Sequence, residues 1–274
     1  MALEKIRGRR INAGELAVVV GAGRSGVAAA RLLRRAGARV RLLDSNLKAL
    51  AGRESLATEL AAQGIEVQLG EHIPGQFAGA AFVVPSPGMP VAKLDGLVDT
   101  QVSEILAEME LAWRYLDDEP VLAITGTSGK TTTASLAAAM LHEQGYAVFL
   151  GGNIGTPLSE YVLGGKKADV LVLEISSFQL QACTTFCPRA GILLNITPNH
   201  LDYHKDMAEY TEAKFRLFRC QSEEDLAVFG EELRSEVAQH NIKARKVFVQ
   251  ATDRFASSCL MGAHNRINEE AAWQ

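Results

Sequence analysis

A lysine followed by three threonines at the start of a helical segment is the most chemically suggestive pattern in this chain. Residues 121–124 form a short apolar run typical of a buried strand, and residues 126–133 read Gly-Thr-Ser-Gly-Lys-Thr-Thr-Thr before an alanine-rich helical stretch. A strand, a glycine-containing turn and a helix in this order make a phosphate site, because N–H groups at a helix N-terminus face the anion. Lys130 would reach the terminal phosphates of a nucleotide, and the Thr131 hydroxyl would help to hold Mg²⁺.

This phosphate loop has a short form. In the general loop four residues separate a first glycine from the Gly-Lys pair, and Ile124 stands at that place here. The pattern Gly-Thr-x-Gly-Lys-Thr-Thr is a variant that keeps the glycine before the lysine. We therefore expect the nucleotide phosphates to be bound by Gly126, Thr127, Ser128, Gly129, Lys130, Thr131 and Thr132.

Further polar groups follow two predicted buried strands. Glu174 comes directly after the apolar residues 170–173, and His200 and Asp202 follow the run at 191–195. A carboxylate at the C-terminal edge of a strand, beside a phosphate loop, can hold Mg²⁺ directly or through water. A helix cap or a solvated side chain is the alternative for Glu174. Loops at this edge collect ligand-binding residues, which favours a functional role for His200.

A second glycine-rich turn lies near the N-terminus. Residues 21–26 read Gly-Ala-Gly-Arg-Ser-Gly between a predicted strand at 16–20 and a predicted helix at 27–36, and Asp44 follows Gly26 by 18 residues. The pattern is similar to the dinucleotide fingerprint, in which a diphosphate approaches the backbone at a helix N-terminus. The pattern alone is weak. Tight helix–sheet packing without a ligand is an alternative, and the sequence offers no identifiable partners for a nicotinamide ring.

Alternating strands and helices predict two α/β units with parallel, doubly wound sheets. A polar segment at 117–120 follows a stretch at 103–116 that predicts one long amphipathic helix. We place the domains at residues 1–105 and 106–274. The last predicted helix, 265–273, has only begun when the chain ends, which is unusual for a sheet domain.

Composition excludes several classes of protein. The formal net charge is −4, so the chain has no overall basic footprint for nucleic acid, and Arg7, Arg9 and Arg10 read as a solvated terminus. No apolar run reaches the roughly 18 residues of a membrane span. We expect a monomer in the cytoplasm with no nucleic-acid or membrane partner. The cysteines lack the paired spacing of a zinc or redox site and read as free buried thiols: Cys183, Cys187, Cys220 and Cys259.

Taken in order, these motifs resemble those of the Mur ligase family. The residues that carry the resemblance are 126–132, 151–155, 174–179, 195–202, Lys214, His264, Asn265 and Asn268. The glycine-rich turn at 21–26, the Ser-Pro-Gly at 86–88 and the Ser-Ser-Phe-Gln after Glu174 make the chain most similar to the members that add D-glutamate. The resemblance covers essentially the whole chain, and the ordered set is more specific than any single motif.

The resemblance implies a Rossmann-like domain for uridine diphosphate, a P-loop ATPase-like central domain and a C-terminal Rossmann-like domain. This chain ends where the central domain should continue, so we expect the C-terminal ligase domain to be absent and the polypeptide to be inactive alone. The implied reaction uses ATP and Mg²⁺. ATP phosphorylates the L-alanyl carboxylate of UDP-N-acetylmuramoyl-L-alanine, and the amine of D-glutamate attacks the acyl phosphate.

The resemblance also implies roles for single residues. Thr131 and Glu174 are expected to hold one Mg²⁺, and His200 and Lys214 a second. Lys214 alone reads as a helix-surface lysine, and only the resemblance implies that CO₂ carbamylates it. Asn268 is expected to contact adenine. The expected catalytic residues are Lys130, Glu174, His200 and Lys214. Substrate contacts are expected from Gly21, Gly23, Arg24, Ser25, Gly26, Asp44, Ser45, Ser86, Gly88, Asn153, Ser176, Gln179 and His200.

Three alternatives stay open at this point. An NAD-dependent oxidoreductase would explain the first glycine-rich turn but not the second phosphate loop. A sister Mur ligase or a folylpolyglutamate-type ligase would share the central motifs. A non-catalytic nucleotide-binding remnant would explain the missing domain.

Overall fold

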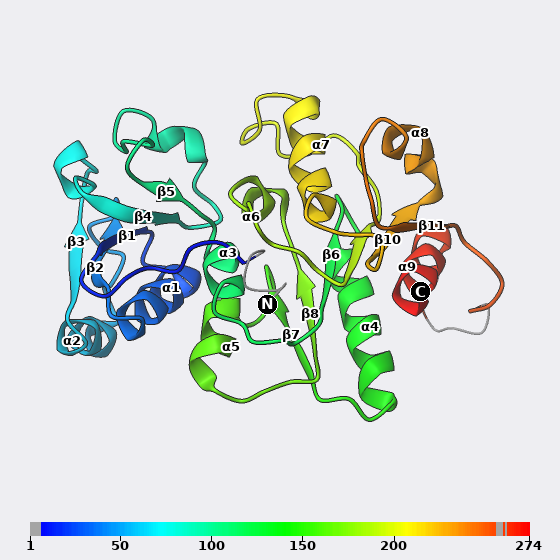
Figure 1. Cartoon of the computed structure of the whole chain (residues 1–274), viewed down its shortest axis with the longest axis horizontal. Helices are drawn as coiled ribbons and strands as arrows, with labels where there is room; N and C mark the ends of the chain where they lie inside the picture. The colour runs from blue at the N-terminus through cyan, green and yellow to red at the C-terminus, as the bar shows by residue number, and fades with distance from the viewer. Residues whose placement is uncertain (1–6, 256–259, 261) are drawn as a thin grey trace. The chain divides into compact units, whose positions relative to one another are not determined.

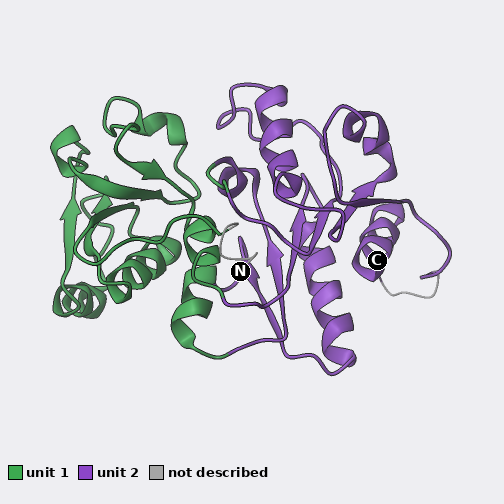
Figure 2. Ribbon diagram, viewed as in Figure 1, with its two compact units in different colours: residues 1–116, 157–166, 182–184 green, residues 117–156, 167–181, 185–274 purple. Residues whose placement is uncertain are grey.

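The chain folds into two compact units, which the computed structural model describes for residues 7–255, 260 and 262–274 (Figure 1). The first unit comprises Met1–Leu116, Pro157–Lys166 and Ala182–Thr184, and the second comprises Asp117–Thr156, Lys167–Gln181 and Thr185–Gln274 (Figure 2). Each unit contains one parallel β-sheet, which confirms the predicted α/β class. The chain returns from the second unit to the first twice, so the units are not simply consecutive.

The first sheet has the strand order β3-β2-β1-β4-β5. Its strands are β1 (Leu16–Val20), β2 (Arg39–Asp44), β3 (Ile65–Leu69), β4 (Ala80–Pro85) and β5 (Glu104–Ile105). Residues 17–20 of β1 are apolar and buried, as suits a central parallel strand covered on both faces. The helices of this unit are α1 (Arg24–Arg35), α2 (Glu54–Ala62), α3 (Glu108–Trp113) and α5 (Leu158–Gly164), with 3₁₀ turns at Pro74–Gln76 and Val91–Leu94.

The second sheet has the strand order β11-β10-β9-β6-β8-β7. Its strands are β6 (Val121–Thr125), β7 (Val148–Gly152), β8 (Val170–Glu174), β9 (Ala190–Leu193), β10 (Leu226–Gly230) and β11 (Arg245–Val249). Its helices are α4 (Lys130–Glu143), α6 (Ser177–Gln181), α7 (Met207–Phe215), α8 (Arg234–Val237) and α9 (Ala263–Trp273), with 3₁₀ turns at Arg216–Phe218 and Glu231–Leu233. Helices α4 and α9 pack side by side (Figure 1). Ile124, Ala134 and Ile192 belong to the apolar core between α4 and the sheet.

The prediction of one long amphipathic helix at 103–116 is wrong. The structure has the short strand β5 there, followed by the six-residue helix α3. All six residues of α3 are buried, including Glu108 and Glu110. The charged positions that suggest a solvent-facing side in fact point into the protein, where other groups pair with them.

The N-terminal arginines are solvated only in part, because Arg9 and Arg10 are exposed as predicted whereas Arg7 is not. The Arg7 side chain is buried, donates to the carbonyl of Leu116 and lies over the ring of Trp113, 4.8 Å from its centroid. The Arg10 guanidinium donates to the carbonyl of Arg114. Arginine stems and planar heads can pack on apolar and aromatic surface, and a count of charges along the sequence does not reveal this.

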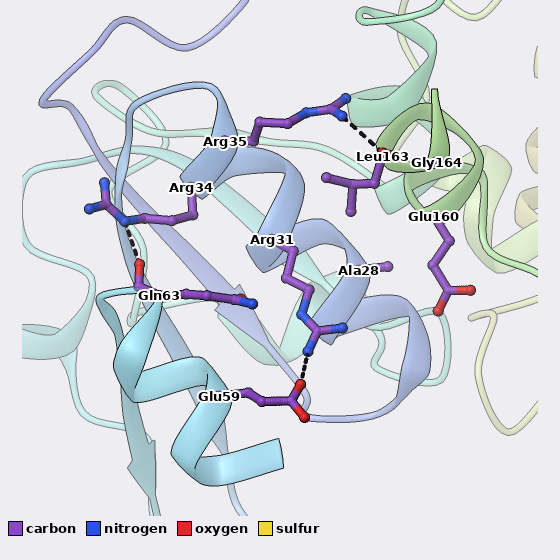
Figure 3. A pocket seen from close by; sticks show the side chains of 9 residues that line it. All are labelled: Ala28, Arg31, Arg34, Arg35, Glu59, Gln63, Glu160, Leu163 and Gly164. Atoms are coloured by element: carbon purple, nitrogen blue, oxygen red, sulfur yellow. Dashed lines mark hydrogen bonds and ion pairs between the residues drawn. The ribbon is translucent and has the colours of Figure 1, made fainter. Parts of the chain in front are cut away.

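Arginines on the C-terminal half of α1 donate hydrogen bonds to carbonyls at the C-terminal ends of two other helices. They line a hollow of about 770 Å³ in the first unit (Figure 3). Arg35 donates to the carbonyls of Val162 and Leu163, in the last turn of α5, at 2.7 and 3.1 Å. Arg34 donates to the carbonyl of Gln63, just after α2, at 2.7 Å. Cations at helix C-termini stabilise the exposed carbonyls there. These guanidinium groups therefore have a structural role, far along α1 from the glycine-rich turn.

The described cysteines carry free thiols, and Cys259 lies outside the described residues. Cys183 is buried, whereas Cys187 and Cys220 are only partly so. Burial raises the pKa of the Cys187 thiol to about 12, which makes it a poor nucleophile near neutral pH. In the described part of the chain no helix is long and apolar enough to cross a membrane.

A buried ion network fixes α3. The Arg114 side chain is 1% exposed and that of Glu110 is 0% exposed, and Arg114 Nη2 lies 3.1 Å from Glu110 Oε1. Arg114 also pairs with Glu104, and Thr184 donates its N–H to Glu110 at 3.2 Å. The Arg114 guanidinium thus balances the charge of the buried Glu110 carboxylate.

We expect Arg114→Met to lower the free energy of unfolding by about 3–5 kcal/mol, because it leaves the Glu110 carboxylate buried without its cation. Urea unfolding measures this loss. Arg31→Met is the matched control, since its partner Glu59 is 57% exposed and an exposed pair contributes under about 1 kcal/mol. Adding Glu110→Gln to Arg114→Met should recover part of the loss. Equal effects of the two arginine substitutions would contradict the buried-charge argument.

Candidate functional site

The second sheet brings the predicted phosphate loop, Glu174 and the His200 loop to one edge. Strand β6 pairs with β8 on one side and with β9 on the other, all in parallel. The loops that follow these three strands therefore leave the sheet at the same, C-terminal edge. The chain also changes direction of winding at β6, and ligands of open α/β sheets bind at such a switch point.

Two glycines shape the phosphate loop. Gly126 has φ +154° and Gly129 has φ +82°, and Gly129 is the N-cap of α4. The first intrahelical bond of α4 runs from the Thr133 N–H to the Gly129 carbonyl, 2.9 Å. The N–H groups of residues 129–132 precede this bond and have no acceptor within the helix. They form the anion-binding end that the sequence predicts.

Asn195 holds the other side of the phosphate loop. Its side-chain oxygen accepts the N–H groups of Thr127 and Ser128 at 3.0 and 2.9 Å, and its amide donates to the Ser128 carbonyl at 3.2 Å. Because these loop N–H groups are engaged, the donors left for a phosphate are those at the start of α4. Sequence reasoning includes Asn195 in a motif but gives it no role. An asparagine directly after a strand beside the loop was the available signal.

The Lys130 side chain lies against the phosphate loop that precedes it. Its ammonium group donates to the carbonyls of Gly126 and Thr127, both at 3.0 Å. Burial lowers the pKa of Lys130, and the nearby Glu174 carboxylate opposes this shift. The side chain lies at the loop, in the place from which a lysine reaches nucleotide phosphates.

Glu174 lies at the predicted metal site. Its carboxylate is buried and accepts the Thr131 hydroxyl at 2.5 Å and the Asn153 amide at 2.8 Å. Thr131 and Asn153 are themselves exposed, whereas the carboxylate that they contact is buried. A carboxylate beside a threonine hydroxyl is a hard-oxygen set that fits Mg²⁺. The described residues contain no cluster of three or more His, Cys, Asp or Glu side chains, so phosphate and water oxygens would complete the coordination.

Lys214 is buried, contrary to the helix-surface reading. Its side chain is 1% exposed, and its Nζ donates to the Gly126 carbonyl at 2.9 Å. Burial, and secondly the charge of Lys130, lower the pKa of Lys214 to about 7. The ammonium also lies 4.6 Å from the centroid of the Tyr210 ring. The Tyr210 hydroxyl is 3.0 Å from that of Thr127, so α7 contacts the phosphate loop twice.

His200 is exposed and held in an unusual conformation. Among the described residues other than glycine it is the one with positive φ, at 56°. Such a conformation costs on the order of 1–3 kcal/mol and is kept where the surroundings enforce it. Its ring packs edge-on against Phe178 of α6, with 4.8 Å between ring centroids. His204, which sequence reasoning missed, lies buried behind this pair.

Ser176 and Gln179 bond to one another at the start of α6. The Gln179 side-chain oxygen accepts the Ser176 N–H at 3.0 Å, and the Ser176 hydroxyl accepts the Gln179 N–H at 3.3 Å. This is a reciprocal capping box, for which Ser-x-x-Gln is the sequence signature. The pair thus has a clear structural role, and its predicted contact with substrate stays a prediction.

Asn268 lies beside the phosphate loop on α9. It is buried, and a methyl group on Gly129 would come within 2.5 Å of its side-chain oxygen. Its amide faces the side chain of Asn265 at 3.3 Å, as their spacing of three on a helix predicts. Its predicted contact with adenine stays a prediction.

In the first unit, the glycine-rich turn packs against the residues predicted to act with it. Gly21 has φ +106°, and a methyl group there would run into the Ser86 side chain. A methyl group on Gly26 would run into the Gly21 carbonyl, so the glycine allows the close approach of α1 to the strand. The Asp44 carboxylate accepts the Ala22 N–H at 2.8 Å and braces the turn.

The remaining predicted residues of this unit lie at its surface. Arg24 is exposed and forms an ion pair of 2.8 Å with Glu160 of α5. Ser25 is half-buried at the start of α1. Gly23, Ser45 and Gly88 are exposed. All of the predicted substrate residues below position 90 therefore belong to one unit, around the C-terminal ends of β1, β2 and β4 and the start of α1.

Comparison with known proteins decides the family. Residues 124–270, more than half of the chain, match the profile of the Mur ligase middle domain, and residues 15–102 match that of the Mur ligase MurD-like N-terminal domain. The chain belongs to the Mur ligase family. The resemblance inferred from the motifs is thereby confirmed, and the first glycine-rich turn belongs to a ligase domain rather than to a dehydrogenase.

Several curated proteins of this Mur ligase family are similar over most or all of the chain. One named UDP-N-acetylmuramoylalanine–D-glutamate ligase, from Desulfovibrio desulfuricans, is 79% identical over 100% of this chain and 63% of its own length. Proteins of the same name from Nitratidesulfovibrio vulgaris and Lawsonia intracellularis are 62% and 50% identical, over 100% and 93% of this chain and 63% and 57% of their own. The chain thus spans less than two thirds of the length of these relatives.

Among solved structures of Mur ligases, a MurF ligase from Thermotoga maritima in complex with ADP is similar at 18% identity and a TM-score of 0.45. The match covers 89% of this chain and 51% of that one.

We expect Gly129→Ala to destabilise the second unit by more than Gly145→Ala. Both glycines flank α4 with nearly equal φ, +82° and +90°, and a left-handed alanine costs on the order of 1 kcal/mol or more at each. A methyl group at 129 also strikes Asn268, whereas at 145 it meets nothing within 4 Å. Urea unfolding of both variants, and of Gly129→Ala with Asn268→Ala, measures the difference. Equal losses, or no relief from Asn268→Ala, would show that the contact with Asn268 is unimportant.

Proposed function

We propose that this Mur ligase is the ATP-dependent ligase that adds D-glutamate to UDP-N-acetylmuramoyl-L-alanine, with residues 1–105 as the UDP-binding domain and 106–274 as the ATP-binding domain. The supporting observation is that Lys130, Thr131 and Glu174 meet at one phosphate loop in a chain 79% identical, along its whole length, to a protein named for this reaction. A sister Mur ligase would share the phosphate loop, but we would not expect it to be 79% identical to a protein of this name.

The proposed reaction has two steps. The L-alanyl carboxylate attacks the γ-phosphorus of ATP, giving an acyl phosphate and ADP. The amine of D-glutamate then attacks the acyl carbon, and inorganic phosphate leaves as the amide bond forms and the amine loses a proton. Both steps move negative charge between oxygens, so the protein acts mainly by neutralising charge and holding groups in place.

The residues of the phosphate loop would bind ATP. The N–H groups at the start of α4 and the Lys130 ammonium would hold the β- and γ-phosphates, and Asn268 would contact the adenine. Thr131 and Glu174 would hold one Mg²⁺, and His200 with carbamylated Lys214 a second, and these ions would supply positive charge to offset that of the phosphates. Asn153, Ser176, Gln179 and His200 would contact the substrate near the reacting carboxylate.

The first unit would bind the uridine diphosphate. The N–H groups at the start of α1 precede its first intrahelical bond, from the Val27 N–H to the Gly23 carbonyl, and offer an anion site. The residues assigned to this contact are Gly21, Gly23, Arg24, Ser25, Gly26, Asp44, Ser45, Ser86 and Gly88. We place the enzyme in the cytoplasm as a monomer.

Lys130→Ala should weaken ATP binding roughly 10- to 150-fold, because a hydrogen bond to a charged group contributes about 1.5–3 kcal/mol. Isothermal titration calorimetry of the chain with ATP and Mg²⁺ gives the affinities. Lys243→Ala, an exposed lysine of the same unit, is the control and should bind like the parent. Equal affinities for all three proteins would remove Lys130 from the nucleotide site.

Ligation tests the proposed function directly. We expect the dipeptidyl nucleotide to form, with ATP and D-glutamate, once this chain is joined to the remaining part of the Desulfovibrio desulfuricans relative, and not with the 274-residue chain alone. The amine must be held about 3–3.5 Å from the acyl phosphate, and an open site lets water compete. Mass spectrometry detects the product. A joined protein that uses L-lysine or diaminopimelate instead of D-glutamate would assign the chain to a sister ligase.

Carbamylation of Lys214 should follow the charge state of its amine. Only the neutral amine adds CO₂, losing a proton as the carbamate forms, and the pKa of about 7 means that the neutral form grows as the pH rises through 7. At constant dissolved ¹³CO₂ we expect a carbamate signal that climbs steeply between pH 6 and 7.5. An absent signal, or an unchanged signal in Lys214→Ala, would refute this assignment.

The neighbouring charge supplies an internal control. Lys130→Ala removes the cation that helps to lower the pKa of Lys214, so that pKa should rise and less carbamate should form at pH 7. Lys243→Ala should leave the signal as in the parent. An identical pH profile in Lys130→Ala would show that burial alone sets the pKa.

A further inference from the structure

A buried histidine with no assigned role lies behind the candidate site. The His204 side chain is 0% exposed, and its Nε2 is 2.9 Å from the hydroxyl of Ser177, the first residue of α6. Its Nδ1 has no hydrogen-bond partner and lies 3.8 Å from Glu209 Oε2, beyond hydrogen-bond range. The imidazole is therefore attached to the second unit by a single directed bond.

Aromatic rings surround His204 and connect it to the site. Its ring is stacked with Phe178, 5.6 Å between centroids, and lies 5.2 Å from the Tyr210 ring. Phe178 is the residue on which His200 packs, and Tyr210 contacts both Thr127 and Lys214. One imidazole thus supports the ring beneath His200 and the ring beneath Lys214.

The backbone joins the two histidines more directly. The carbonyl of His200 accepts the N–H groups of Tyr203 and His204, at 3.0 and 2.9 Å. These bonds close a turn whose first residue is the strained His200 and whose last residue is anchored by its side chain.

We propose that His204 is a positioning residue, which through its hydrogen bond to Ser177 locks the turn at 200–204 and so holds the His200 imidazole toward the metal-nucleotide site. The inference rests on the role proposed above for His200. Burial lowers the pKa of His204, with Lys214 and His200 adding to this and Glu209 opposing it. The hydrogen bond between its Nε2 and the Ser177 hydroxyl does not require a charged ring.

The test compares five single substitutions in the 274-residue chain. His204→Phe keeps the ring but loses the bond to Ser177, Ser177→Ala removes the partner, and His204→Gln can restore a polar contact. His240→Phe is the matched control, because that imidazole is also stacked on a phenylalanine of this unit, with 3.6 Å to the Phe215 centroid, away from the turn. His200→Ala sets the size of the full loss.

Two measurements separate positioning from simple stability. The first is Mn²⁺ affinity of the ADP-loaded chain, by electron paramagnetic resonance; a residue behind a metal ligand typically affects affinity about 10- to 100-fold. We expect His204→Phe and Ser177→Ala to approach the loss in His200→Ala, the pair of substitutions to be no worse than either alone, and His204→Gln to recover part. The second is hydrogen exchange of residues 199–206, which should accelerate in His204→Phe and not in His240→Phe.

The outcomes are distinguishable. If His200→Ala weakens Mn²⁺ binding and His204→Phe does not, His204 is only a packing residue and the proposal is overturned, whatever the change in melting temperature. Unchanged exchange at 199–206 in His204→Phe would overturn it as well. If His200→Ala itself keeps full affinity, the metal role of His200 in the proposed function is wrong and this inference fails with it.

Discussion

Two lysine side chains share one backbone carbonyl in the second unit, and much of the site depends on that arrangement. Lys130 and Lys214 both donate to the Gly126 oxygen, from α4 and from α7. Two ammonium groups that close together, with Lys214 fully buried, repel one another, and the more buried one is the easier to neutralise. The result is a lysine with a pKa of about 7 beside a second lysine whose pKa burial also lowers and Glu174 helps to keep up. Gly126 accepts both bonds while its φ is +154°, a backbone region that favours glycine.

Contacts of this kind require that strands β6, β8 and β9 keep their pairing register. Strand β6 ends one residue before Gly126, β8 ends at Glu174, and β9 leads to Asn195, so the parallel pairing sets where each group emerges. Helix α7 then has to dock with Tyr210 and Lys214 toward the loop. A slip of one residue in β8 would point Glu174 to the other face of the sheet. The site is accurate because it is built on strand ends rather than on a long loop.

Much of the fold and part of the site were predictable from the sequence. Buried parallel strands are continuous apolar runs, so β1, β6 and β8 stand where the sequence places them to within one residue. The loop at 126–132 is likewise a local signal. The prediction at 103–116 failed because the glutamates at 108 and 110 look solvent-facing in the sequence. Their hydrogen-bond donors, the N–H groups of Ser159 and Thr184, lie far along the chain. His204 escaped notice for the same reason, because its partner Ser177 is 27 residues away.

The buried charges of the two units show how structural and chemical groups differ. The Glu110 carboxylate pairs with a guanidinium and accepts the Thr184 N–H, so both its charge and its hydrogen bonding are satisfied within the protein. Glu174 has hydrogen bonds from a threonine and an asparagine, both neutral, and Lys214 has a carbonyl and the face of an aromatic ring. A buried ion that has only neutral hydrogen-bond partners keeps a large electrostatic free energy. That free energy favours a counter-ion for the carboxylate and loss of a proton from the amine. The neutral hydrogen-bond partners of Glu174 and Lys214 therefore support the metal and carbamate sites proposed at this edge of the second sheet, whereas Glu110 has its cation within the fold.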